Sequence, residues 1–444
     1  MTATYWSPHG WTGHESVDGI EVVVDATGTI SSVAARPTPT RGAIHLEGVM
    51  VPGLVNAHSH AFHRALRART HEQGDFWAWR ELMYRIADAL QPDTYEALAT
   101  AVFGEMALAG VTTVGEFHYL HHDRQGARYD DRNAMSHAVV RAARSAGLRL
   151  VLLDTCYLTA DVDGAALEGP QLRFSDGSAD AWHERHQLLA GDYAAVAEVT
   201  VGAAVHSVRA VPQQAMSTVA AGAGTGPLHV HLSEQLRENQ RCIEVLGRTP
   251  TQVLADGGAL GPMTTGVHAI HVGAGDRALL ATSGSMVCLC PTTERDLGDG
   301  WAPAAEFAAD GIRWALGSDS HASIDLFEEA RAVELNDRAR LHRRGIHDPV
   351  ALLAAATTVG VQSLGIEGGR LVAGHPADFV VIRPDTVRMA GNLSVSSVVF
   401  AATAGDVAHV FVAGRHIVDR GRHQLIESVP RLLTAAIHAI GIDS

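Results

Sequence analysis

The sequence predicts an α/β fold, a (β/α)8 TIM-like barrel with a small β-sandwich domain built from both chain termini. Three observations predict this fold. Short apolar runs alternate with Ala-rich amphipathic stretches between about residues 50 and 365. Glycines follow several of the amphipathic stretches, as is typical of helix ends. The two ends of the chain instead show period-two alternation, which is typical of strands that bury one face.

Eight apolar runs are the expected barrel strands, and each has the length of a buried strand. They cover residues 48–55, 111–117, 148–156, 199–205, 227–232, 265–272, 286–290 and 312–317. Helical patterns lie between them, for example at residues 92–109, 133–146, 213–221 and 276–283. Gly110, Gly147, Gly284 and Gly311 mark helix ends. Eight β–α repeats predict a closed parallel barrel with an outer ring of helices.

The two ends of the chain are expected to form a second, smaller domain. Strand patterns occur at 20–24 and 30–33 around Gly28, and again at 377–382, 398–400, 409–412 and 416–418, with a turn at Gly414. Neither end can bury a β face alone, so we expect them to fold together. The predicted division is 1–49 for the first part of the small domain, 50–365 for the barrel, and 366–444 for the second part with a terminal helix.

The composition excludes several classes of function. The net charge is −15 and no basic stretch interrupts the acidic balance, which argues against nucleic-acid binding. No run approaches the roughly 18 apolar residues that a membrane span needs, and residues 1–6 lack a signal-peptide pattern. The four scattered cysteines indicate reduced thiols and a cytoplasmic protein. Cys288 and Cys290 also fit a soft metal pair, a less favoured interpretation.

Histidines and one aspartate follow strands that meet in a closed barrel. His58 and His60 end the first strand, one residue apart and therefore on the same side. His231 ends the fifth strand, and Asp319 follows the eighth, which neighbours the first. Three imidazole nitrogens and one carboxylate oxygen suit Zn²⁺, and the same donors are compatible with Fe²⁺. A catalytic ion of this kind keeps a position for water and lowers its pKa.

Further polar residues near these strand ends are candidates for proton transfer. Glu234 lies three residues after His231 and is close enough to exchange protons with a bound water. His268 ends the sixth strand, where it can hydrogen-bond the reacting group or act as an alternative ligand. Asp319 can both bind the metal and accept a proton. Taken singly, Glu234 is also compatible with a helix cap and Asp319 with an ordinary turn residue.

Several strings of the sequence carry a resemblance to a known family. They are Val51-Pro-Gly-Leu-Val-Asn-Ala-His-Ser-His60, Phe76-Trp-Ala-Trp-Arg-Glu-Leu-Met-Tyr84, Gly115-Glu-Phe-His-Tyr-Leu-His-His122, His206-Ser-Val-Arg209, His229-Val-His-Leu-Ser-Glu-Gln235, Cys290-Pro-Thr-Thr-Glu-Arg-Asp-Leu-Gly-Asp-Gly300, Gly369-Arg-Leu-Val-Ala-Gly-His-Pro-Ala-Asp378 and Val412-Ala-Gly414. Together they resemble the amidohydrolase superfamily, in its cytosine-deaminase-like branch with one zinc ion. Within that branch they are most similar to the deiminases that act on N-formimino-L-glutamate.

The resemblance implies hydrolysis of N-formimino-L-glutamate to N-formyl-L-glutamate and ammonia, a step of histidine degradation. It also implies that Arg80, Tyr119, His206 and Arg209 hold the amino-acid part of the substrate. Arginine suits this task because its planar guanidinium makes two-point contacts with carboxylates. Without the resemblance, Arg80 is better interpreted as a surface charge on a helix at 77–89. His63 stands where the family often has Gln, and an imidazole there can contact the substrate as donor or acceptor.

Two other interpretations remain open at this point. Another deaminase of the superfamily, acting on a purine, pyrimidine or nucleoside, would favour aromatic and amide side chains over two arginines. A metal-free binding or scaffold protein on the same barrel would be expected to have lost the ligands, whereas all four are present. The expected partner is a small amino-acid-derived molecule, and association into a homodimer is compatible with the sequence.

Overall fold

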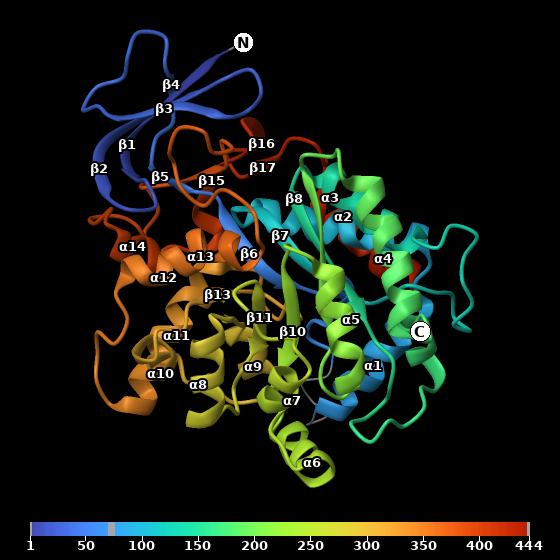
Figure 1. Ribbon diagram of the computed structural model, residues 1–444. Helices are drawn as coiled ribbons and strands as arrows, with labels where there is room; N and C mark the ends of the chain where they lie inside the picture. Colours follow the sequence, from blue (N-terminus) through green and yellow to red (C-terminus); the bar gives the residue numbers. More distant parts are fainter. Residues whose placement is uncertain (1, 70–75, 442–444) are drawn as a thin grey trace.

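The computed structural model describes residues 2–69 and 76–441, and its larger part is a parallel barrel. Eight strands pair in parallel, each with the next along the chain (Figure 1). They are β6 (Leu54–Ser59), β7 (Val111–His118), β8 (Arg149–Cys156), β9 (Val199–Val205), β10 (Leu228–Leu232), β11 (Thr264–His268), β12 (Met286–Leu289) and β13 (Trp314–Leu316). A bridge between Ser59 and Asp319 joins the last strand to the first. The predicted barrel is confirmed.

Helices connect the strands and lie around the outside of the barrel (Figure 1). Those up to β13 are α1 (Phe76–Ala89), α2 (Pro92–Leu108), α3 (Ala134–Ala146), α4 (Ala179–Tyr193), α5 (Gln213–Ala223), α6 (Leu236–Leu246), α7 (Pro250–Asp256), α8 (Ala274–Ser283), α9 (Pro291–Asp296) and α10 (Ala304–Ala309). Later helices are α11 (Leu326–Leu341), α12 (Pro349–Ala355), α13 (Thr358–Ser363), α14 (Val395–Phe400) and α15 (Val429–Ala439). Gly147 and Gly284 cap α3 and α8 in the left-handed conformation, as the sequence predicts.

Both ends of the chain contribute to one nine-stranded sheet. Its strands are β1 (Ala3–Trp11), β2 (Ser16–Val24), β3 (Ile30–Ala35), β4 (Ile44–His45), β5 (Val49–Pro52), β14 (Phe379–Ile382), β15 (Val407–Val412), β16 (Arg415–Asp419) and β17 (Arg422–His423). The rings of Tyr5 on β1 and Phe411 on β15 are 4.7 Å apart, although three strand spacings would separate them by about 14 Å in a flat sheet. The sheet therefore folds back on itself around a shared core.

Strand β5 shows how the small sheet is attached to the barrel. Met50 packs into the core of the small sheet with Tyr5 and Phe379. Val49 and Val51 point to the other face and join the main core of the barrel. Because successive side chains of a strand point to opposite faces, one short strand serves two cores.

Two sequence predictions about strands were wrong. The run at 48–55 is not one barrel strand: β5 belongs to the small sheet, and the barrel begins at Leu54. The break falls at Gly53, whose amide donates to the carbonyl of Asp378 (2.9 Å). The run at 398–400 lies in helix α14, because Ser394 caps that helix by accepting from the amide of Ser397. Strand β1 was not predicted.

The small sheet lies at the amino-terminal end of the barrel strands, where Arg149 at the start of β8 pairs with Asp378 (2.8 Å). This leaves the carboxyl ends of the strands free to form a site. In the described part of the chain no helix combines the length and apolar character that crossing a membrane requires. The division into residues 1–49, 50–365 and 366–444 stays a prediction.

Candidate active site

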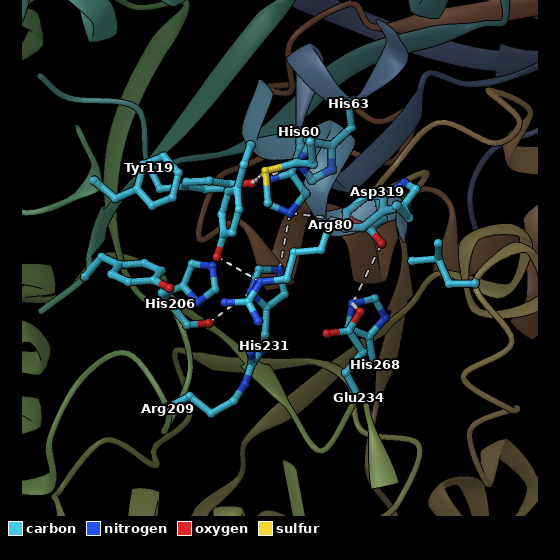
Figure 2. A pocket seen from close by; sticks show the side chains of 16 residues that line it. His60, His63, Arg80, Tyr119, His206, Arg209, His231, Glu234, His268 and Asp319 are labelled. Atoms are coloured by element: carbon cyan, nitrogen blue, oxygen red, sulfur yellow. Dashed lines mark hydrogen bonds and ion pairs between the residues drawn. The ribbon is translucent and has the colours of Figure 1, made fainter. Parts of the chain in front are cut away.

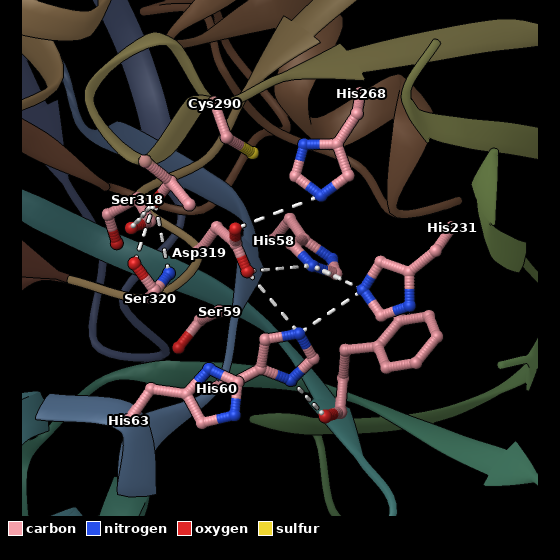
Figure 3. Close-up of polar contacts among 12 residues, drawn as sticks. His58, Ser59, His60, His63, His231, His268, Cys290, Ser318, Asp319 and Ser320 are labelled. Atoms are coloured by element: carbon pink, nitrogen blue, oxygen red, sulfur yellow. Dashed lines mark hydrogen bonds and ion pairs between the residues drawn. The ribbon is translucent and has the colours of Figure 1, made fainter. Parts of the chain in front are cut away.

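Four side chains converge at the carboxyl ends of the barrel strands (Figure 3). The Nε2 atom of His231 lies 3.2 Å from Nε2 of His58 and 3.2 Å from Nε2 of His60. Oδ1 of Asp319 lies 3.4 Å from each of the latter two atoms. These ligand atoms come from β6, β10 and the loop after β13, all within 4.8 Å of one another. The structure thus brings the predicted metal ligands to one point.

Backbone carbonyls orient two of these imidazoles. Nδ1 of His60 donates to the carbonyl of Phe117 (2.9 Å), and Nδ1 of His231 donates to that of His206 (2.9 Å). A carbonyl only accepts, so each neutral ring carries its proton on Nδ1 and presents a lone pair at Nε2. Two lone pairs 3.2 Å apart repel each other unless a cation lies between them.

The spacing of the donor atoms fits a tetrahedral ion. Zinc–nitrogen bonds of about 2.0–2.1 Å place neighbouring ligand atoms about 3.3 Å apart in a tetrahedron. The observed separations of 3.2 and 3.4 Å agree with that value. His58, His60, His231 and Asp319 therefore fit a zinc-like divalent cation.

Burial keeps the imidazoles of this site neutral. Removal from water lowers the pKa of His58 to about 3 and that of His60 to about 4. Burial alone would raise the pKa of Asp319, but its hydrogen bond with His58 holds that pKa well below its usual range. The site therefore offers neutral nitrogens and an ionised carboxylate, the forms that bind a metal.

A buried carboxylate supports the loop that carries the histidine pair. Glu116 on β7 accepts from the hydroxyl of Ser59 (2.5 Å) and from the amide of Ala61 (2.6 Å). Burial raises the pKa of Glu116 to about 8. On the opposite side, the side chain of Asn56 bonds both the hydroxyl (2.7 Å) and the amide (2.9 Å) of Ser318. The contacts of Glu116 fix β6 against β7, and those of Asn56 fix β6 against the end of β13.

Two predicted catalytic residues lie beside the ligand set without being part of it. Nε2 of His268 is 3.8 Å from Oε1 of Glu234 and 3.8 Å from Oδ2 of Asp319. Burial raises the pKa of Glu234. Burial alone would lower the pKa of His268, but the neighbouring carboxylate of Glu234, with others, raises it. Helix α6 starts at Leu236 with Gln235 as its cap, so Glu234 does not cap it.

The backbone is strained where the strands deliver these side chains. His268 and Asp319 have positive φ angles of 71° and 41°, and Ser233, just before Glu234, has 49°. Residues other than glycine rarely adopt this region, and such strain clusters at functional sites. It turns each side chain from the strand direction into the pocket.

A pocket that is partly open to solvent extends from the ligand set (Figure 2). Its lining combines polar and aromatic side chains from strand ends, loops and helix α1. The lining residues are His60, His63, Trp79, Arg80, Met83, Tyr84, Tyr119, Tyr157, Phe174, His206, Arg209, His231, Glu234, His268, Leu297 and Asp319.

The predicted substrate-binding residues all line this pocket. Arg80, on α1, donates to the hydroxyl of Tyr84 (2.8 Å) and is partly buried rather than a plain surface charge. Arg209 lies 3.4 Å from Glu238 through its Nε. Nε2 of His63 and the hydroxyl of Tyr119 are hydrogen-bonded (2.8 Å).

The comparisons with known proteins agree with this geometry. The model of the amidohydrolase family matches residues 49–417. The chain belongs to the amidohydrolase family. It is 37% identical to a formimidoylglutamate deiminase of Pseudomonas aeruginosa, with 94% of this chain and 93% of that protein covered.

Two further proteins are similar to this amidohydrolase. A 5-methylthioadenosine/S-adenosylhomocysteine deaminase of Teredinibacter turnerae is 28% identical over 87% of this chain and 84% of that protein. An amidohydrolase of Brucella melitensis has a crystal structure that superposes with a TM-score of 0.92 at 30% identity, with 99% of each chain covered. Fold and family are thus shared along the whole barrel.

For one string behind the resemblance, only some of the side chains are described. The string at 76–84 begins with three residues whose side chains are not described, whereas its Arg80 and Tyr84 face the pocket. The structure brings together every predicted site residue. Their individual roles stay predictions.

Sequence reasoning missed part of the amidohydrolase pocket. Tyr157 directly follows β8, just as Tyr119 follows β7, so the same strand-end rule would have found it. Trp79, Met83 and Tyr84 share one face of α1 with Arg80, but nothing in the sequence indicates which face of that helix turns to the barrel. Phe174 ends a short 3-10 helix and Leu297 directly follows α9, and neither position carries a sequence signal.

The cysteine pair is not a shared ligand group in the described residues. Cys288 packs with Ala57 and Ala315 inside the barrel. Cys290 alone lies within reach of His268 and Asp319, in a second potential ligand group beside the first.

Proposed function

We propose that this amidohydrolase is a deiminase that hydrolyses N-formimino-L-glutamate and water to N-formyl-L-glutamate and ammonia, a step of histidine degradation. The observation that carries the proposal is one pocket with a metal-ligand set at its floor and two arginines, Arg80 and Arg209, in its lining. A substrate with a hydrolysable amidine at one end and two carboxylates at the other matches both ends. The similarity to the Pseudomonas aeruginosa enzyme supports it.

His58, His60, His231 and Asp319 would hold one Zn²⁺, and Fe²⁺ suits the same donors. A divalent ion in such a site supplies Lewis acidity and lowers the pKa of water. The pocket opens beside His60, His231 and Asp319, so the reacting carbon of a bound substrate can lie next to these residues.

Proton transfer is assigned to the residues beside the ligands. Asp319 accepts a proton from the attacking water through its carboxylate. Glu234 lines the pocket and receives this proton from Asp319, and later the remaining proton of the added hydroxyl group. It delivers both protons to the terminal nitrogen, because ammonia leaves far more readily than an amide anion. His268 lies between Glu234 and Asp319 and donates a hydrogen bond to the reacting group. The C–N bond to the terminal nitrogen breaks, and the oxygen of water remains on the formyl carbon.

Substrate recognition is assigned to the opposite part of the pocket. Arg80 and Arg209 pair with the two carboxylates of the glutamate part, as planar guanidinium groups do well. Tyr119 and His206 complete the contacts to the amino-acid part. His63, hydrogen-bonded to Tyr119, takes the place of the amide that the family often carries there.

A second candidate is a deaminase of a purine, pyrimidine or nucleoside. It is favoured by the aromatic side chains in the pocket, Trp79, Tyr84, Tyr119, Tyr157 and Phe174, which suit a flat heterocycle. The relative from Teredinibacter turnerae acts, by its name, on adenine nucleosides. Two arginines in the same lining argue for the acidic substrate instead.

The test is an ammonia-release assay with the two substrate classes side by side. We expect rapid release from N-formimino-L-glutamate, loss after chelation, and recovery on adding Zn²⁺. Guanine, cytosine, adenosine and 5-methylthioadenosine should release ammonia at least about 100-fold more slowly, since none can pair with both arginines. Faster release from any of these heterocycles would replace the proposed substrate.

The cellular setting is proposed from the same features. Four buried free cysteines suit a reducing compartment such as the cytoplasm. The partner is a small molecule, with neither nucleic acid nor membrane involved, and a homodimer stays a prediction.

A further inference from the structure

Another group of metal-ligating side chains lies in the small sheet, on the hairpin of β15 and β16. Nδ1 of His409 is 3.2 Å from Nε2 of His416 and 3.2 Å from Oδ1 of Asp419. Nε2 of His416 is 3.9 Å from the same carboxylate oxygen. The small sheet lies at the amino-terminal end of the barrel strands, opposite the pocket. This group, which we call the hairpin triad, is therefore separate from the candidate active site.

A β-bulge builds the hairpin triad. Val410 pairs with Val418, but the next residue, Phe411, pairs with His416, so β16 carries one extra residue at this point. In a regular strand His416 and Asp419 would point to opposite faces, because they are three residues apart. The extra residue reverses that alternation and turns both toward His409.

Packing holds the triad in this arrangement. The His416 ring stacks on Phe411, with centroids 4.2 Å apart and planes 7° from parallel. A ring fixed in this way loses little further freedom when Nε2 acquires a ligand.

The arrangement of donor atoms favours a cation over a hydrogen-bond network alone. One hydrogen on His409 Nδ1 has two acceptors at the same distance of 3.2 Å and cannot bond both well. A single ion contacts all three atoms at once. The separations also match those of the ligands at the barrel floor, where two of them are 3.2 Å.

We propose that His409, His416 and Asp419 form a second metal site, which takes one borderline divalent cation such as Zn²⁺. Two imidazoles and a carboxylate are donors that suit this class of ion. The side chains are 13%, 34% and 43% exposed, so water completes the coordination. With one imidazole fewer and the charged Arg420 nearby, the site binds more weakly than the barrel floor. A bound ion ties β15 to β16 and stabilises the hairpin.

The test is a zinc titration of the full chain after chelation, read as bound zinc per protein after gel filtration. We expect two equivalents for the unaltered protein and one for His416→Gln. The first equivalent should restore the same hydrolytic activity in both. The second should raise the melting temperature of the unaltered protein only.

Two further variants make the outcome decisive. Asp419→Asn keeps the shape of the side chain and should also bind one equivalent. His9→Gln is the matched control: it removes another histidine of the same sheet, 3.7 Å from Asp18. It should still bind two equivalents. A single equivalent in the unaltered protein, or a second equivalent retained by both triad variants, would overturn the proposal.

Discussion

The floor and the rim of the pocket are built on different principles. At the floor, His58, His60, His231 and Asp319 extend from strand ends, and their side chains are almost wholly buried. At the rim, Arg80 extends from helix α1, and Arg209 from the segment after β9 with Glu238 of α6 beside it. Strand positions are fixed by the hydrogen bonds of the barrel. Rim positions depend on how helices and loops pack over its end.

This difference places the residues proposed for the chemical step and those proposed for substrate recognition in different parts of the pocket. In the proposed function, the floor activates water beside a carbon–nitrogen bond. The rim determines which molecule is presented to the floor. We therefore expect changes at the floor to abolish metal binding at the floor and, with it, activity. Changes at the rim should alter capture of the substrate.

The largest effect is expected when a floor ligand is removed. His231→Ala should lose the metal of the floor. The value of kcat/KM should fall by about 10⁴-fold or more, since the Lewis acid is worth several kcal/mol. Metal analysis and the ammonia assay measure the two effects. The matched control is His229→Ala, on the same strand, where Nε2 bonds the carbonyl of Ser363 at 2.9 Å. It should keep the metal of the floor. Equal metal loss in both variants would contradict the assignment.

Glu234→Gln should separate proton transfer from metal binding. We expect turnover to fall by about 10²–10⁴-fold with the metal retained, because the amide cannot shuttle a proton. Metal content and kcat, measured on one preparation, check this. Glu244→Gln, on the exposed side of α6, should behave like the unaltered protein. Near-normal turnover in Glu234→Gln would remove this residue from the reaction.

At the rim, Arg209→Met should weaken capture and leave the metal in place. Loss of a charged hydrogen bond of about 1.5–3 kcal/mol lowers kcat/KM by about 10–100-fold, mainly through KM. Hydrolysis of a neutral formimino compound without carboxylates should not change. If both substrates slow equally, Arg209 acts on the architecture of the pocket and does not bind a carboxylate.

The smallest effect is expected for His63→Gln, which introduces the residue that the family often carries. The substitution changes one neutral hydrogen bond, to Tyr119, so kcat/KM should change by about 2–10-fold. Steady-state kinetics measure it, with Tyr119→Phe as the partner variant. Loss of bound metal in His63→Gln would move this residue from the rim to the floor.

The sequence predicts the barrel well because its signals are local. Apolar runs of strand length and glycines at helix ends repeat along the chain. Five of the eight predicted runs contain the whole of the corresponding barrel strand, and two more are short of it by one residue. The failures occur where tertiary context decides. At 48–55 a single apolar run serves two domains, split by Gly53. At 398–400 three apolar residues fit a strand or a helix equally, and the cap at Ser394 determines a helix.

The site follows the same division. Floor residues could be predicted because strand order alone brings the ends of β6, β10 and β13 together. Arg80 could not be placed by periodicity, since a helix face is only assigned once the helix is docked. Tyr84 and Trp79 were missed for that reason. Phe174 was missed because it ends a 3-10 helix of six residues, which is too short to show a periodic pattern.

The most direct test of the proposed ligand set at the floor is X-ray absorption by the protein loaded with one equivalent of Zn²⁺. We expect only nitrogen and oxygen neighbours at about 2.0–2.1 Å, from three imidazoles and one carboxylate, with water as an added ligand. A sulfur neighbour at about 2.3 Å would instead place the ion with His268 and Cys290. That result, or the absence of tightly bound zinc, would contradict the assignment of His58, His60, His231 and Asp319 as the ligands.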